Sequence, residues 1–235
     1  MSLVIAIKDK DRIVLGADRQ SSVGGTKDHT STKIWPVRDL PGALMGSVGS
    51  ARASQVIQYS NVIDKNVLSK EITTEYIICV ISPLIAASLK SNGVAVNNPD
   101  GGICDIMPNT FIFAYKDKAW MIWNDFSVSE ITDYLAIGSG SDIAKGALFA
   151  TQDKNPFERI VTGIDAAAIN TLYVDNEIDL LATAVKPSDE KQINAALGLP
   201  QPIKEAKETK KSTKSTNKAA KTKKLFIILY ILVRY

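Results

Sequence analysis

The stretch from Ser2 to Asp18 reads Ser-Leu-Val-Ile-Ala-Ile-Lys-Asp-Lys-Asp-Arg-Ile-Val-Leu-Gly-Ala-Asp, two apolar runs around a short polar turn. The runs Leu3–Ile7 and Ile13–Ala17 are almost continuously apolar, which is typical of strands buried on both faces. The turn at residues 9–11 joins them into a predicted antiparallel hairpin. Because a hairpin brings the chain back to its start, we expect Asp18 to lie near Ser2.

Periodicity predicts the remaining elements. Residues 33–37 and 43–48 form a second predicted hairpin around Pro41-Gly42. Residues 51–67 have helical spacing, with a predicted buried face of Ala53, Val56, Ile57, Ser60 and Ile63. Residues 72–89 form a second predicted helix, with a predicted stripe of Ile72, Tyr76, Val80, Leu84 and Ala87 and a kink at Pro83. Residues 91–109 are predicted as a loop.

The second half repeats this order. Strands are predicted at 111–115, 119–123, 134–137 and 177–185, and helices at 143–151 and 156–172. Two helices between each pair of strand blocks can cover one outer sheet face each. The fold class predicted is therefore α+β, as a four-layer α-β-β-α sandwich.

Composition limits the chemistry. The chain has 235 residues, of which 45% are hydrophobic and 23% charged, as expected for one large globular domain rather than a disordered chain. Two cysteines, Cys79 and Cys104, and one histidine, His29, are too few for a zinc cluster or a multi-histidine metal site. We expect no cofactor and no metal. The few cysteines and the lack of a signal peptide after Met1 predict a cytoplasmic protein.

Charge divides the chain. Residues 1–186 are predicted as the folded domain, 187–203 as a C-terminal extension and 204–235 as a lysine-rich disordered tail with a short apolar end. Residues 204–224 hold nine lysines and two glutamates, although the net charge is only +3. The apolar run Leu225–Val233 is too short to span a membrane. A nucleic-acid or membrane-surface binder is one alternative function, but the acidic domain and the lack of aromatic residues among the lysines argue against both partners.

The N-terminus offers a nucleophile. Removal of Met1 would leave Ser2 with a hydroxyl and a free α-amine, whose unperturbed pKa is about 7.7–8.0. The amine could act as the base, an arrangement that needs no histidine. Asp18 and Lys33, at strand ends, could hold an ammonium group beside the hydroxyl. Gly46-Ser47-Val48-Gly49-Ser50 could present backbone N–H groups to an oxyanion. Taken alone, these residues are equally compatible with surface charges and tight turns.

Four motifs carry a family resemblance over about residues 2–186. They are Ile13-Val14-Leu15-Gly16-Ala17-Asp18-Arg19, Thr32-Lys33-Ile34, Gly46-Ser47-Val48-Gly49-Ser50-Ala51 and Ala136-Ile137-Gly138-Ser139-Gly140-Ser141. In order and spacing the chain resembles 20S proteasome subunits, above all the β-type and its bacterial relative HslV. The resemblance implies an N-terminal nucleophile (Ntn) hydrolase fold and assembly with other proteasome-like subunits into stacked rings. It implies unfolded proteins or peptides as substrates, with a regulatory ATPase as a further candidate partner.

The resemblance also implies site residues. The family's N-terminal threonine falls on Ser2, its strand-end aspartate on Asp18, its active-site lysine on Lys33, its oxyanion glycine on Gly49, and the serine that supports the amine on Ser139. One motif departs from the family: the late Asp-x-x-Ser falls on Thr171 and Val174, and Asp175 or Asp165 is a candidate replacement. The implied activity is that of a threonine-type endopeptidase using serine. The alternative is a catalytically silent subunit that only builds the ring.

Overall fold

Two antiparallel sheets lie face to face at the centre of the structure, a computed structural model that describes residues 2–23, 26–28, 32–38, 40–60, 62–63, 71–94 and 107–199. The first sheet has the strand order β10-β1-β2-β11. Its strands are β1 (Leu3–Asp9), β2 (Arg12–Asp18), β10 (Tyr134–Gly138) and β11 (Ile178–Ala182). The predicted N-terminal hairpin is confirmed, because β1 and β2 pair antiparallel with Val4 opposite Ala17.

The second sheet has the strand order β5-β6-β7-β8-β9. Its strands are β5 (Ile34–Pro36), β6 (Ala43–Gly49), β7 (Asn109–Tyr115), β8 (Lys118–Ile122) and β9 (Val128–Glu130). A separate small hairpin, β3 (Ser21–Val23) and β4 (Thr26–Asp28), follows β2. The predicted hairpin around residues 41–42 is confirmed by the pairing of β5 with β6. The small hairpin and β9 were not predicted.

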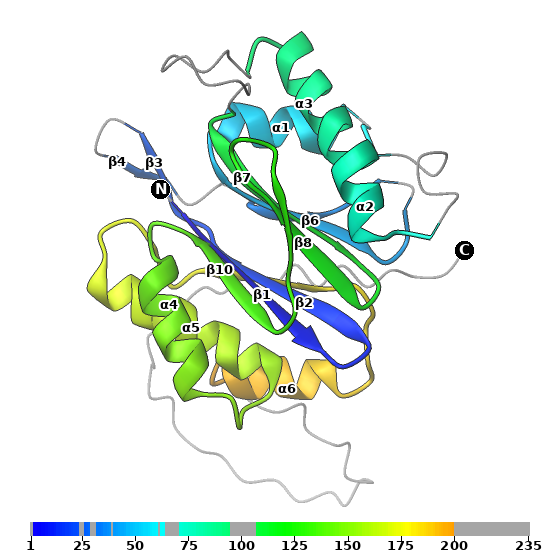
Figure 1. Ribbon diagram of the computed structural model, residues 1–235. Helices are drawn as coiled ribbons and strands as arrows, with labels where there is room; N and C mark the ends of the chain where they lie inside the picture. The colour runs from blue at the N-terminus through cyan, green and yellow to red at the C-terminus, as the bar shows by residue number, and fades with distance from the viewer. Residues whose placement is uncertain are drawn as a thin grey trace, which may run out of the picture.

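Helices cover the outer face of each sheet, which gives four layers (Figure 1). On the second sheet lie α1 (Ala51–Tyr59), α2 (Thr74–Tyr76), the π-helical turn Ile77–Ile81 and α3 (Ser82–Ser91). On the first sheet lie α4 (Ser141–Ala150), α5 (Pro156–Asn170) and α6 (Asp189–Ala196). One apolar cluster lies between the two sheets and one lies between each sheet and its helices. The predicted four-layer α-β-β-α sandwich is therefore confirmed.

Local sequence explains where α5 begins. Asn155 caps the helix, because its side-chain oxygen accepts a hydrogen bond from Glu158 N at 3.0 Å. Pro156 occupies the first turn, where no backbone N–H is needed. Ile160 and Ile164 are fully buried against the first sheet. Gly16 of β2 leaves the space that the Ile160 side chain fills, since a Cβ there would lie 2.1 Å from Ile160 Cγ2.

The helical stripe predicted for residues 72–89 is confirmed at Ile72, which is buried, and is wrong by one position at residues 76, 80 and 84. The fully buried residues are Ile77, Ile81, Ile85 and Leu89, whereas Ala87 of the predicted stripe is exposed. The offset is already present at Ile77, the first residue of the π-helical turn, and the next four residues are also apolar, so periodicity alone does not determine which of them is buried. The predicted disruption at Pro83 thus takes the form of a π turn.

The segment Thr74–Ser91 is long and apolar enough, with a mean hydropathy of 1.2, to pass as a membrane-spanning helix by length and composition. Its isoleucine stripe packs in the core against the second sheet, and 28% of the segment is buried. The predicted helix over 51–67 ends earlier, at Tyr59, and residues 64–70 lie outside the described residues. The predicted face is otherwise buried at Ala53, Val56, Ile57 and Ile63, but Ser60 is exposed.

The C-terminal helix α6 was not predicted either. It packs against α5, and its Asp189 binds Arg12 of β2 through two hydrogen bonds of 2.6 and 2.9 Å. Residues 200–235, including the lysine-rich tail, lie outside the described residues. The division at residues 186 and 203 therefore stays a prediction.

Candidate active site

Asp18 stands at the centre of the candidate site. It is the last residue of β2, fully buried, and both of its oxygens accept hydrogen bonds. Oδ1 accepts from the backbone N–H of Leu3 at 2.7 Å, and Oδ2 accepts from Gln20 N at 3.1 Å. The Asp18 carboxylate therefore binds the backbone at two places, at Leu3 directly after Ser2 and at Gln20 directly after β2.

Lys33 lies beside Asp18, just before β5. Its ammonium donates to Asp18 Oδ1 at 2.6 Å and to the backbone oxygen of Gln20 at 2.7 Å. Lys33 is 6% exposed and Asp18 0% exposed, so the ion pair is shielded from water. Because Asp18 Oδ1 binds both the Lys33 ammonium and the Leu3 amide, the ammonium is fixed next to the residue that begins the first strand.

Ser139 brackets the backbone of Ser2 from the other side. Its N–H donates to Ser2 O at 2.9 Å, and its hydroxyl lies 3.2 Å from Ser2 N and 3.3 Å from Ser2 O. The preceding residue, Gly138, has φ +104, and a Cβ there would lie 2.0 Å from Ser2 O. Only glycine allows the turn after β10 to approach Ser2 so closely.

Gly49 ends β6 on the same side of the sandwich. Val48 packs near Gly138, whose missing Cβ would lie 3.2 Å from Val48 Cγ1. Ser47 N donates to Lys33 O at 2.9 Å, which ties β6 to the residue that carries the ammonium. N–H groups alternate in direction along a strand, so Gly49 N–H points to the same side as Ser47 N–H. The five predicted site residues thus gather at one end of the two sheets.

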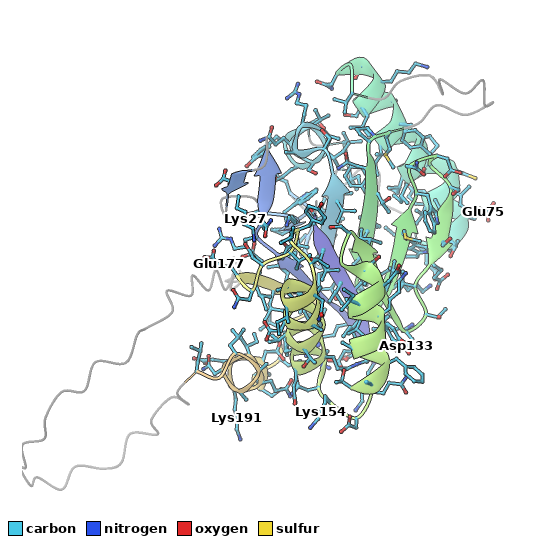
Figure 2. All side chains as sticks on the ribbon, turned by 90° about the vertical axis from the view of Figure 1, so that its left-hand side faces the viewer. Lys27, Glu75, Asp133, Lys154, Glu177 and Lys191 are labelled. Carbon is cyan, nitrogen blue, oxygen red and sulfur yellow. The ribbon has the colours of Figure 1, made fainter. Side chains whose placement is uncertain are left out.

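That end lies where β1 begins and the small hairpin β3–β4 projects (Figure 1). In Figure 2, Lys27 of β4 and Glu177, just before β11, mark the same end, while Lys191 of α6 points away from the sandwich. Arg19 N donates to Glu177 O at 3.0 Å, which closes the sheet edge next to Asp18. The site is therefore built from strand ends and the turns that follow them.

Burial shifts the two charged groups in opposite directions. It raises the pKa of Asp18, and the Lys33 ammonium opposes that rise. It lowers the pKa of Lys33, and the negative charge of Asp18 opposes that fall. A lysine that releases its proton more readily than in water is suited to a site where protons move during the reaction.

Two residues with direct roles in this geometry were not predicted. Gln20 is fully buried, and it contributes its backbone oxygen to Lys33 and its side-chain amide to Leu172 O at 2.9 Å. Its position two residues after Asp18 is a weak sequence signal, because aspartate often accepts from the N–H two residues later. Asn109 begins β7 and is buried behind Gly49. Nothing in the sequence near Asn109 indicates that distant contact.

The residues at the position of the family's late motif lie near the ion pair of Asp18 and Lys33, and whether they replace that motif stays a prediction. Thr171 caps the C-terminal end of α5, and Val174 is buried against the Gly140 turn next to Ser139. Asp175 accepts from Arg19 N at 3.3 Å and from Glu177 N at 3.1 Å, and its negative charge adds to the rise in the pKa of Asp18 and opposes the fall in the pKa of Lys33. Asp165 is half-buried on α5. The charge of Asp175 therefore acts on the ion pair of Asp18 and Lys33.

Metal chemistry finds no support in the described part of the chain. No group of three or more histidine, cysteine, aspartate or glutamate side chains there could hold a metal ion. Cys79 is a free, exposed cysteine on the π turn. His29 and Cys104 lie outside the described residues.

A four-layer α-β-β-α sandwich in which a serine precedes the first strand, beside a buried lysine–aspartate pair, has the fold of an Ntn hydrolase of the proteasome-like class. The chain belongs to the proteasome β-subunit family. It is 30% identical over 155 residues to the proteasome subunit beta of Nanoarchaeum equitans, a match that covers 64% of this chain and 74% of that protein.

Solved structures share the same fold. The BPH protein of Thiobacillus denitrificans in complex with epoxomicin is 20% identical, with a TM-score of 0.61 over 79% of this chain and 100% of that one. HslV of Trypanosoma brucei is 18% identical, with a TM-score of 0.50 over 77% of this chain and 98% of that one. No model of a known protein family matches this chain.

Proposed function

We propose that this chain is the proteolytic subunit of a proteasome-like, self-compartmentalising protease, and that Ser2 is its nucleophile after Met1 is removed. The observation that carries this proposal is the single oxygen, Asp18 Oδ1, that binds both the Leu3 amide at 2.7 Å and the Lys33 ammonium at 2.6 Å. It fixes a positive charge beside the residue whose hydroxyl and amine would react.

The proposed reaction is acyl transfer. The α-amine of Ser2 takes the hydroxyl proton while Oγ bonds to the scissile carbonyl carbon, and the Lys33 ammonium favours the alkoxide. Gly49 N–H donates to the oxyanion, a contact typically worth about 3–4 kcal/mol. The protonated amine then gives its proton to the leaving nitrogen as the peptide bond breaks. Water, activated by the same amine, releases the acyl group from Ser2.

Ser139 has a proposed supporting role. Its hydroxyl lies 3.2 Å from Ser2 N, so it can hold the amine once Met1 has been removed. Serine lacks the methyl group that restricts χ1 in threonine, so the backbone contacts of Ser139 and Gly138 become more important for orienting Ser2. A Ser2→Thr variant should therefore remain active.

We also propose that the chain assembles into rings with other proteasome-like subunits. In support, large apolar side chains are exposed where α5 ends, with Ile169 83% and Leu172 73% accessible to solvent. The proposed substrates are unfolded proteins or peptides, with a regulatory ATPase as a further partner. A cytoplasmic location stays a prediction.

The test combines intact mass with peptide hydrolysis. For the assembled wild-type protein we expect a mass lower by one methionine and cleavage of fluorogenic peptides. Ser2→Ala should lose that cleavage and keep the assembly, whereas Ser60→Ala, at an exposed serine after α1, should retain both. Retained Met1, or equal activity in Ser2→Ala, would contradict the proposal.

The second candidate is a silent subunit that builds the ring without cleaving. Val174 favours it, because this buried side chain next to the Gly140 turn occupies the place of a family serine and brings no hydroxyl. The intact-mass and Ser2→Ala measurements separate the two candidates. An assembled, processed and inactive wild-type protein would identify the silent one.

A further inference from the structure

A buried polar cluster lies directly behind the turn that carries Gly49. Its centre is Asn109, the first residue of β7, which pairs with Gly49 across the sheet and is 2% exposed. Ser47, also 2% exposed, belongs to the same cluster. A buried carboxamide needs partners for its donors and its acceptor, and here the partners are the residues on each side of Gly49.

The Asn109 side chain holds Ser50 at two points. Its Oδ1 accepts from Ser50 N at 3.0 Å, and its Nδ2 donates to Ser50 O at 3.1 Å. Because Ser50 N–H can only donate, it fixes which end of the amide is the oxygen. The Nδ2 group also donates to Ser47 Oγ at 2.7 Å and lies 3.2 Å from Ser54 Oγ.

These bonds grip the chain before and after Gly49. Ser47 precedes Gly49 by two residues and is anchored on its other side by the bond from its N–H to Lys33 O. Gly49 itself has φ +120, and a Cβ there would lie 2.1 Å from Pro108 O. A side chain is therefore excluded at this position and cannot anchor the residue. Its orientation therefore depends on its neighbours, and Asn109 binds two of them.

We propose that Asn109 is a positioning residue for catalysis, which fixes the Gly49 N–H in the direction where the oxyanion forms. This inference rests on the proposed function, since it assigns the oxyanion to Gly49. A donor held in place before the reaction stabilises the transition state without reorganising. Loss of the grip should therefore lower kcat more than it changes KM.

The kinetic test uses the assembled full chain. Asn109→Ala should lower kcat about 10–100-fold with KM within about two-fold of wild type, since the donor is displaced but not removed. Asn92→Ala is the matched control, because it removes the same carboxamide from an exposed asparagine at the end of α3, away from Gly49; its kcat should stay within about two-fold. A kcat within two-fold for Asn109→Ala, or a change in KM alone, would overturn the proposal.

Asn109→Asp adds a readout that a purely structural role would not give. The new carboxylate can still accept from Ser50 N, but when ionised it has no donor for Ser50 O. When protonated it has one. The ratio of variant kcat to wild-type kcat should therefore rise as the pH falls, whereas a ratio that is independent of pH contradicts the assigned bonds.

Hydrogen exchange separates this inference from the proposed function, because it needs no activity. In Asn109→Ala, amides of residues 47–50 should exchange at least about ten-fold faster than in wild type, with the rest of β6 unchanged. Unchanged exchange overturns the inference even in an inactive enzyme. If exchange is faster in Asn109→Ala but the processed wild-type protein has no peptidase activity, both the proposed function and the catalytic role of Asn109 are overturned.

Discussion

The ammonium of Lys33 is the positive charge that the proposed chemistry places beside the Ser2 alkoxide. We predict that Lys33→Met lowers kcat/KM by at least about 10²-fold, because the alkoxide of Ser2 loses its neighbouring positive charge. Asp18 can take up a proton in this variant, so the fold should survive. Lys186→Met is the control, since that lysine pairs at the surface with Asp11 at 2.6 Å. Peptide hydrolysis and thermal unfolding of both variants measure the effect, and an active Lys33→Met would reject the role.

The pH dependence follows from the same side chain. Activity should rise with pH as the Ser2 amine loses its proton, and fall again as Lys33 loses its own. Burial lowers the pKa of Lys33 from its ordinary value of 10.5, so the alkaline fall should begin below that pH. A profile of kcat/KM against pH checks this, with circular dichroism at each pH as the control for unfolding. Activity that stays constant beyond pH 10.5 contradicts it.

The residues of the site differ in how far the sequence could predict them. Ser2 and Asp18 lie at the open end of one antiparallel hairpin. Because the two strands are joined by a short turn, their proximity could be predicted from the sequence alone. Gln20 and Asn109 take part through contacts that depend on the packing of separate sheets. A buried Asn109 that binds Ser50, 59 residues away, has no local pattern that could indicate it.

At the scale of the element, the turn between β10 and α4 sets the position of Ser2. We predict that Gly138→Ala costs about 3 kcal/mol or more of stability and most of the activity, since the new Cβ would lie 2.0 Å from Ser2 O at φ +104. Gly146→Ala is the matched control within α4, where a Cβ meets nothing within 4 Å. It should stabilise the protein by about 0.5–1 kcal/mol.

Urea unfolding and peptide hydrolysis of the two glycine variants decide the point. If Gly138→Ala matches wild type in both, the close approach of this turn to Ser2 is not required. If Gly146→Ala loses stability, the gain expected from replacing a helical glycine with alanine is absent, and Gly146 cannot serve as the control. Opposite signs at two glycines only eight residues apart would show that the positive φ and the close approach to Ser2, rather than glycine itself, are what matter.

Elements with strong periodicity were predictable, and those that depend on a distant partner were not. The β1–β2 hairpin was predicted because its strands are continuously apolar on both faces. The stripe on residues 72–89 was misplaced because residues 77–81 are all apolar, so their period does not determine which of them faces the sheet. Helix α6 was missed because it is short and polar, and a buried ion pair with Arg12 fixes it to β2.

For the whole molecule, that ion pair joins the two ends of the described chain. Arg12 donates to Asp189 at 2.6 and 2.9 Å, to Asp9 at 2.8 Å and to Ala184 O at 2.9 Å, and its guanidinium lies 5.6 Å from the Phe157 ring centroid. Asp189 and Arg12 are both nearly inaccessible to solvent. Burying two charges is costly, so such a pair is maintained only while both partners are present.

We predict that Asp189→Ala lowers the free energy of unfolding by about 3 kcal/mol, because it leaves the Arg12 guanidinium buried with only Asp9 as its charged partner. The control is Asp142→Ala on α4, whose exposed carboxylate lies 3.7 Å from Lys145 and should contribute less than about 1 kcal/mol. Urea titrations of both variants measure the difference. Since α6 lies at the opposite end of the sandwich from Ser2, peptidase activity per folded subunit should be unchanged in Asp189→Ala (Figure 1). A loss of activity without a loss of stability would mean that the C-terminal helix acts on the site directly, and that the two ends of the sandwich are coupled.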